Sequence, residues 1–167
     1  MSWSRRRAGL AGLAGLAAVA LAGCGFSPVY GPQGSGSRLS GRIRLAEPRT
    51  PDDFAFVGRL AERLGPETQP RYALDYRLRI AVVPQAITPD EVTTRYALNG
   101  SADFVLRDIA SGRDISRGQV SSFTSYSTTG TTIATMSAEY DAHGRLARML
   151  ADQVVTRLLA IDPARLP

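Results

Sequence analysis

The stretch RYALDYRLRIAVV, residues 71–83, is the clearest periodic segment of the chain. Apolar side chains occupy every second position, namely Tyr72, Leu74, Tyr76, Leu78, Ile80 and Val82. The positions between them include Asp75, Arg77 and Arg79. Successive side chains of a β-strand point to opposite faces, so this alternation predicts a strand with one buried face and one polar face.

The same alternation returns in TTRYALNGSADFVLRD, residues 93–108, after a predicted loop at residues 84–91 that contains two prolines. One face carries Tyr96, Leu98, Ala102, Phe104 and Leu106, and the other carries Arg95, Asn99, Asp103 and Arg107. Two long neighbouring strands with matching alternation predict one sheet with one covered face. At roughly 1.5–3 kcal/mol for each large apolar side chain that becomes buried, this face is the expected main source of the core.

A third long strand is predicted at residues 115–126, after a turn at Ser111 and Gly112. Its apolar residues are Ile115, Val120, Phe123 and Tyr126. They do not keep one phase of the alternation, so we expect a bulge or a strong twist in this strand. A short strand with the sequence GRIRLA, residues 41–46, precedes the other three.

A helix is predicted to begin at the sequence TPDDF. Thr50 is a favourable N-cap, Pro51 suits the first helical position, and carboxylates in the first turn favour the positive end of the helix dipole. Asp52 and Asp53 are therefore interpreted as capping residues rather than as a catalytic acid and base. Gly65 ends the helix. The predicted apolar stripe consists of Phe54, Val57, Leu60, Ala61 and Leu64.

A polar loop is predicted at residues 127–135, and a long amphipathic helix from about Ser137. Its predicted stripe consists of Tyr140, Ala147, Leu150, Ala151, Val154, Leu158 and Ile161. The order strand, helix, three strands and helix predicts an α+β fold, a two-layer sandwich in which two helices pack on one face of a four-stranded mixed sheet. We expect this domain at residues 38–162 and a short C-terminal tail at residues 163–167.

The N-terminal residues have the pattern of a secretory signal peptide. Arg5, Arg6 and Arg7 are followed by residues 8–23, which contain only Ala, Gly, Leu and Val. As a transmembrane helix, this run would span roughly 24 Å at about 1.5 Å per residue, less than a hydrocarbon core of about 30 Å. We therefore predict a signal peptide at residues 1–23.

The apolar run ends in Leu21, Ala22, Gly23 and Cys24, which resembles the lipobox of bacterial lipoproteins. Small side chains before the cysteine allow the backbone to enter a peptidase site, and the thiol is a soft nucleophile that can accept a diacylglycerol. We favour lipid attachment at Cys24 over a buried free cysteine, and a single cysteine cannot form a disulfide within the chain. Residues 24–37, rich in Gly, Pro and Ser, are then a flexible tether behind an effectively permanent anchor.

Charge and motifs argue against nucleic-acid binding and against catalysis. The chain has 20 basic and 15 acidic residues, and loss of three arginines with the signal peptide leaves 17 against 15, or +2. One His and one Cys exclude a His/Cys metal cluster, and no phosphate-binding loop or dinucleotide fingerprint appears. His143 is interpreted as a solvated or partly packed helix residue rather than a base. We predict a non-enzyme with no cofactor and no metal.

These features together resemble the LptE family of LPS-assembly lipoproteins. The lipobox runs directly into CGFSPVYG, residues 24–31, and the predicted elements follow in the order of that family. Residues 124–126, 134–135, 138–142 and 145–158 look like the strand-to-helix segment of its alphaproteobacterial form. The resemblance extends from the lipobox almost to the end of the chain.

The resemblance implies an outer-membrane lipoprotein, lipid-anchored on the periplasmic face, that plugs and helps assemble the LptD β-barrel for lipopolysaccharide transport to the cell surface. The implied partners are the LptD β-barrel and lipopolysaccharide. Gly25, rather than Asp, after the lipidated Cys24 agrees with outer-membrane sorting as known in some bacteria. The alternative is a lipid-anchored accessory subunit of an inner-membrane transport system.

Four arginines on the predicted polar sheet face are candidate contacts for phosphates of lipopolysaccharide or for acidic groups of the barrel wall. They are Arg77, Arg79, Arg95 and Arg107. The alternative is an ordinary solvated strand face on which Asp75 and Asp103 pair with arginines of the neighbouring strand. The sequence leaves both interpretations open.

Overall fold

The computed structural model describes residues 28–87 and 93–167. The predicted signal peptide and the predicted lipid-attachment residue Cys24 lie outside the described residues. None of the helices within the two described ranges is both long and apolar enough to cross a membrane.

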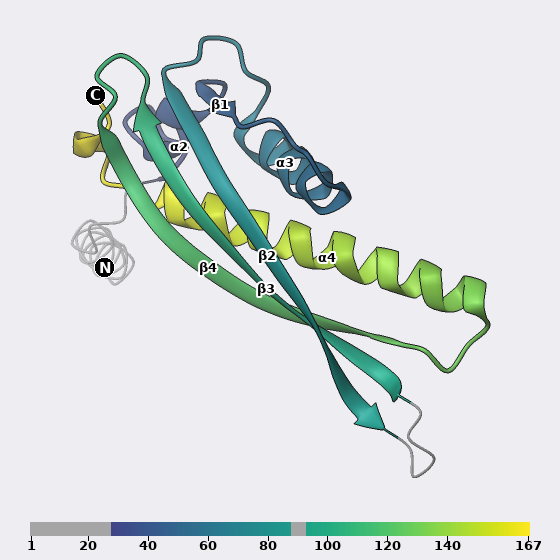
Figure 1. Ribbon diagram of the computed structural model, residues 1–167. Helices are drawn as coiled ribbons and strands as arrows, with labels where there is room; N and C mark the ends of the chain where they lie inside the picture. Colours follow the sequence, from purple (N-terminus) through teal and green to yellow (C-terminus); the bar gives the residue numbers. More distant parts are fainter. Residues whose placement is uncertain (1–27, 88–92) are drawn as a thin grey trace, which may run out of the picture.

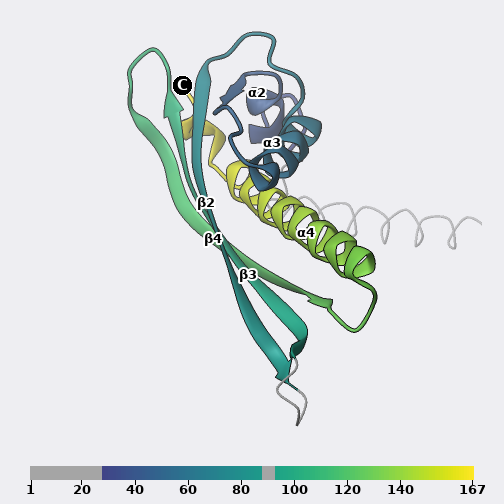
Figure 2. The same ribbon diagram turned by 45° about the vertical axis from the view of Figure 1, so that its right-hand side comes forward.

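The described chain forms one mixed sheet with helices on one of its faces (Figure 1). In chain order the elements are α2 Ser35–Leu39, β1 Ile43–Leu45, α3 Pro51–Leu64, β2 Tyr72–Ile87, β3 Thr93–Asp108, β4 Asp114–Ser127, α4 Thr132–Leu159 and the 3-10 helix η1 Pro163–Arg165. The strand order is β1-β2-β3-β4, with β1 parallel to β2 and the other neighbours antiparallel. Figure 2 shows α3 and α4 on the same side of the sheet. The predicted α+β fold with a four-stranded mixed sheet is confirmed.

The two longest strands, β2 and β3, separate apolar and polar side chains as their alternation predicts. They pair in register from Tyr72 opposite Asp108 to Pro84 opposite Tyr96. Six of the predicted apolar residues are at most 3% exposed, and these are Tyr72, Leu74, Leu98, Ala102, Phe104 and Leu106. The helices therefore cover the predicted face, and the arginines lie on the other one.

The strand β2 continues through Pro84, where the sequence predicted a loop. Even-numbered residues of β2 direct their N–H groups away from β3, as Tyr72 does when it donates to Arg42 O (3.0 Å). Proline has no N–H, so at this position it removes no hydrogen bond from the β2–β3 pair. The register shifts only after Pro84, at Ala86 and Ile87.

The predicted irregularity of the third long strand is a bulge near the start of β4. The register shifts between Leu106 and Arg107 of β3, which makes Ile115 the extra residue of β4. The bulge turns Ile115 onto the same covered face as Val120, and both side chains are 5% exposed. Phe123 stays on the opposite face and is 74% exposed.

Thr50 is the N-cap of α3, as predicted, and it forms a capping box with Asp53. The N–H of Asp53 donates to Thr50 Oγ1 (3.1 Å), and the N–H of Thr50 donates to Asp53 Oδ2 (3.0 Å). The predicted stripe is wrong at Phe54, which is 64% exposed, because Phe56 is buried instead with its ring centroid 4.9 Å from that of Tyr76. Both phenylalanines fit a helical stripe, so contact with the sheet decides between them. Burial under α3 raises the pKa of Tyr76 to about 12.

The long helix α4 begins earlier than predicted, at Thr132, because Thr131 caps it by accepting a hydrogen bond from the N–H of Ala134 (3.3 Å). The predicted loop through Thr135 is therefore too long. Tyr140 was expected in the stripe but is 75% exposed, because it borders an open hollow between the first turn of α3 and α4. The buried residues of α4 are Ala142, Leu146, Ala147, Leu150, Ala151, Val154, Val155 and Leu158.

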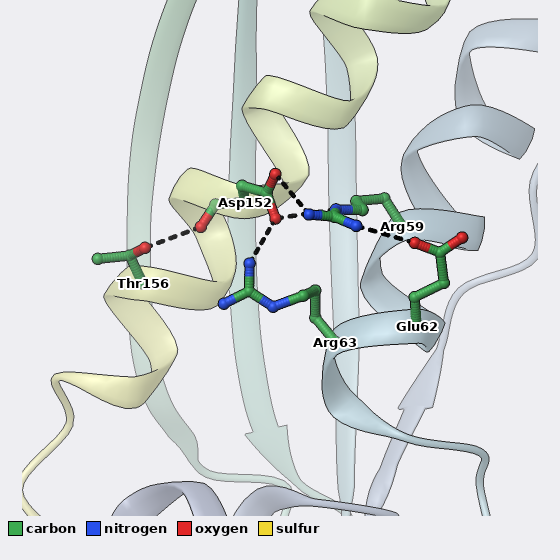
Figure 3. Close-up of polar contacts among 5 residues, drawn as sticks. All are labelled: Arg59, Glu62, Arg63, Asp152 and Thr156. Atoms are coloured by element: carbon green, nitrogen blue, oxygen red, sulfur yellow. Dashed lines mark hydrogen bonds and ion pairs between the residues drawn. The ribbon is translucent and has the colours of Figure 1, made fainter.

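An ion cluster joins α3 to α4 above the core (Figure 3). Asp152 accepts two hydrogen bonds from Arg59, at 3.0 and 3.2 Å, and one from Arg63 at 2.8 Å. Arg59 also donates to Glu62 (3.0 Å), and Thr156 Oγ1 donates to the backbone carbonyl of Asp152 (2.9 Å). The hydrogen bond to Asp152 is the main cause that raises the pKa of Arg59. The cluster fixes which turns of the two helices lie opposite each other.

Both ends of the described chain pack against the C-terminal end of α4. Ser35 Oγ donates to the carbonyl of Leu159, and Arg38 Nη1 donates to the carbonyls of Pro163 and Leu166 (both 3.2 Å). Leu166 is only 2% exposed. The packed region thus includes residues that we expected in the N-terminal tether and in the C-terminal tail.

Two matched glycine substitutions test the packing of α4 on β3. A Cβ atom on Gly100 would lie 2.9–3.0 Å from the buried side chains of Leu146 and Leu150, so Gly100→Ala should lower the free energy of unfolding by about 1–3 kcal/mol. Gly58 lies in the exposed middle of α3 with nothing within 4 Å, so Gly58→Ala should raise it by about 0.5–1 kcal/mol. Urea unfolding of both variants measures the difference. Equal stabilities would contradict the close approach of α4 to β3.

Candidate functional site

The four candidate arginines all lie on the outer face of the sheet, opposite the helices. Arg77 and Arg79 belong to β2, and Arg95 and Arg107 belong to β3. In the β2–β3 register, Arg77 lies opposite Asp103. The structure therefore confirms the face on which these side chains lie, and it separates them into two pairs with different surroundings.

Arg79 and Arg107 are held by carboxylates of neighbouring strands. Arg79 forms an ion pair with Asp103. Arg107 contacts Asp114 through Nε (3.1 Å) and Asp75 through Nη1 (3.3 Å), so it links β2, β3 and β4. For these two arginines the structure shows the ordinary paired strand face that the sequence left open as an alternative.

Arg77 and Arg95 have a different environment. Both are exposed, and neither forms an ion pair with any residue in the ranges 28–87 and 93–167. A guanidinium without a carboxylate partner keeps all of its donors for a ligand, and its planar fork matches phosphate or carboxylate oxygens. These two side chains are the better candidates for contact with an anionic ligand.

Two polar residues of the outer face were not singled out from the sequence. Asp114 also pairs with Arg117 (2.6 Å), and Gln119 Nε2 donates to Asp103 Oδ1 (2.8 Å). Their roles depend on the register of β4 against β3, which the bulge at Ile115 shifts. Alternation within one strand carries no information on that register.

The only histidine of the chain belongs to a hollow of about 480 Å³ between the first turn of α3 and α4. His143 Nδ1 lies 3.1 Å from each carboxylate oxygen of Asp52. Met136 and Tyr140 also line this hollow and are exposed. Within the described part of the chain, no three His, Cys, Asp or Glu side chains are grouped to hold a metal ion. His143 is therefore a partly packed residue that contacts the neighbouring helix, as the sequence favoured.

Comparison with known proteins assigns the family. A family model for LptE, described as lipopolysaccharide-assembly, matches residues 42–158, which is more than half of the chain. The chain belongs to the LptE family. The match includes all four candidate arginines and ends within α4. A comparison with curated protein sequences gave no significant match.

Solved structures of lipoproteins share the fold. A candidate lipoprotein from Caulobacter crescentus CB15 matches with a TM-score of 0.60 and 22% identity, covering 75% of this chain and 92% of that one. The rare lipoprotein B from Shewanella oneidensis gives 0.54 and 11%, covering 70% and 91%. A minor lipoprotein from Acinetobacter baumannii gives 0.51 and 17%, covering 75% and 92%. At these identities the comparisons establish a common fold for this LptE-family chain.

The different surroundings of the arginines predict different effects on stability. Arg107→Gln removes ion pairs to two strands, so it should lower the free energy of unfolding, by no more than about 1 kcal/mol because the side chains are partly exposed. The loss should shrink at high salt, which screens exposed charges. Arg77→Gln is the control and should leave unfolding unchanged. Equal losses in urea unfolding for the two variants would contradict the assigned partners.

Proposed function

We propose that this LptE-family chain is an outer-membrane lipoprotein, anchored on the periplasmic face by lipid on Cys24, that plugs and helps assemble the LptD β-barrel for lipopolysaccharide transport. The observation that carries the proposal is the family match over residues 42–158. The N-terminal sequence agrees with it, because a run typical of a signal peptide ends at Leu21-Ala22-Gly23-Cys24. Lipid attachment would make the membrane association effectively permanent.

The form of the domain suits a plug. The strands β2 and β3 each have 16 residues, which corresponds to a length of roughly 50 Å at about 3.3 Å per residue. The outer face of this long sheet is polar, with Arg77, Asp103 and Gln119 among its side chains. A polar outer face is compatible with the water-filled interior of a large β-barrel.

The side chains of the outer face suit a binding role. His143 contacts Asp52 and has no nucleophile among its described hydrogen-bond partners. Arg77 and Arg95 would then be the contacts for phosphate groups of lipopolysaccharide or for acidic groups of the barrel wall.

Co-purification is the experiment that tests the partner. The full chain, extracted in a mild detergent from its native membrane, should recover a large heat-modifiable β-barrel protein. Recovery of an ATPase and a permease instead would replace this proposal with the alternative of an accessory subunit at the inner membrane. The two outcomes differ in the mass and the heat-modifiability of the captured protein.

Replacement of the predicted lipid-attachment residue tests the anchor. Cys24→Ala removes the only thiol of the chain, so the variant should accumulate as an uncleaved or mislocalised precursor without labelled palmitate. Membrane fractionation and palmitate labelling measure both effects. Unchanged outer-membrane fractionation and undiminished label would contradict the assignment as a lipoprotein.

Arg77 and Arg95, which form no ion pair within the described part of the chain, predict a salt-dependent contact with lipopolysaccharide. The double variant Arg77→Gln/Arg95→Gln of the full chain should bind lipopolysaccharide more weakly than the wild type at low salt, because two free guanidinium groups are lost. Wild-type binding should itself weaken as salt is added. The matched control, Arg79→Gln/Arg107→Gln, removes the same charge from arginines that already have partners and should have a smaller effect. Equal binding of lipopolysaccharide by the two double variants would contradict the distinction between these two pairs of arginines.

A further inference from the structure

The free edge of β4 is unusually open to another strand. Among the residues that the structure describes, β4 is the last strand of the sheet and pairs only with β3. From Gly118 to Ser127 it reads GQVSSFTSYS, ten residues without a charged side chain or a proline. Over these residues the register with β3 is continuous, so no bulge interrupts the edge. Proteins normally protect such edges with charges, prolines or bulges, because unpaired backbone groups attract other strands.

The direction of the backbone groups along β4 follows from its hydrogen bonds. Thr128 N–H donates to Thr94 O (3.0 Å), so this residue directs its N–H toward β3. In an antiparallel pair, alternate residues face the partner and the free side. The N–H and C=O groups of Gln119, Ser121 and Phe123 therefore point away from β3. Ser125 agrees, because its carbonyl accepts a hydrogen bond from Arg145 on the free side (3.5 Å).

The other free edge of the same sheet shows the contrast. β1 pairs only with residues 72–74 of β2, so the rest of β2 also has a side that is unpaired within the ranges 28–87 and 93–167. That edge carries Arg77 and Arg79, then Pro84, then a register shift. Each of these features discourages strand addition. One edge of this domain is protected, and the other is not.

The surroundings of β4 leave room for an added strand. The side chain of Phe123, on the outer face of the open edge, is 74% exposed. A hollow of about 520 Å³ lies between the start of β4 and the end of α4, and its lining is largely charged, with Arg117, Arg157, Asp162 and Arg165 beside Gly118 and Ile161. A fifth strand beside residues 118–123 would pack a side chain against Phe123.

We propose that the β4 edge, from Gly118 to Phe123, accepts an extended uncharged segment of the barrel partner as a fifth strand of the sheet. The proposal rests on the proposed function, since the barrel partner supplies the segment. An uncharged edge matches an uncharged segment, because a buried charge on the added strand would have no partner between Gly118 and Phe123. Main-chain hydrogen bonds would give affinity, and the contact with Phe123 would set the register.

The first test removes one edge donor without touching the β3–β4 pair. Ser121→Pro deletes an N–H that points to the free side, and Pro84 shows that β2 accommodates a proline in the equivalent orientation. Ser121→Ala is the matched control, because it keeps the N–H. Extracted in mild detergent, the wild type and Ser121→Ala should recover the barrel equally, and Ser121→Pro should recover at least about tenfold less, corresponding to the loss of roughly 1.4 kcal/mol of binding free energy.

The second test needs no variant, so it still tests the edge contact if Ser121→Pro fails to fold. Amide hydrogen exchange of the full chain is compared with and without the captured barrel. The amides of Ser121 and Phe123 should become protected at least about tenfold in the complex. Those of Leu78 and Ile80, which also point to a free side but on the protected edge, should not change.

The outcomes separate this inference from the proposed function. Equal barrel recovery by a folded Ser121→Pro variant, or no added protection at Ser121 and Phe123, overturns the edge contact and leaves the barrel as partner. If the wild-type chain forms a dimer and Ser121→Pro dissociates that dimer, the edge binds a second copy of the chain. This outcome also overturns the proposed contact with the barrel. Failure of the wild type to recover any barrel overturns both the proposed function and the occupant of the edge.

Discussion

The burial of one sheet face beneath α4 is the interaction on which the rest of the structure depends. Gly100 in the middle of β3 lets Leu146 and Leu150 approach the backbone, because a Cβ atom there would lie at most 3.0 Å from both side chains. α4 contacts both β3 and β4, and α3 then packs beside it through the cluster around Asp152. Without that close approach the apolar side chains of the long strands would remain exposed to water. The sheet would then have no covered face opposite its polar face.

Period-two alternation predicted the fold well because it reports a property of each strand alone. Residues 71–83 and 93–108 separate their side chains onto two faces in the structure as they do in the sequence. The errors lie where two elements meet. Phe54 and Phe56 fit the same helical pattern, and only the position of Tyr76 selects Phe56 for burial. Tyr140 continues the stripe of α4 but is left exposed beside the hollow between α4 and the first turn of α3.

The candidate arginines could be placed on a face from the sequence, but their partners could not. Arg79 meets Asp103, and Arg107 meets both Asp75 and Asp114, through pairings that depend on the register of three strands. The bulge at Ile115 sets the register of the third strand, and nothing in the alternation of β2 or β3 encodes it. The register therefore decides which positive charges are neutralised within the sheet and which, like those of Arg77 and Arg95, stay available.

The two faces of the sheet differ from each other, and so do its two edges. Across its thickness, one face is apolar and covered, while the other is polar and carries the arginines. Along its width, the β2 side is protected by charges and Pro84, while the β4 side carries no charge from Gly118 to Ser127. A charged or proline residue in that stretch of β4 would not disturb the core if it replaced an outward residue such as Ser121 or Ser125. Its absence is therefore not required by folding, which agrees with the proposed addition of a strand at this edge.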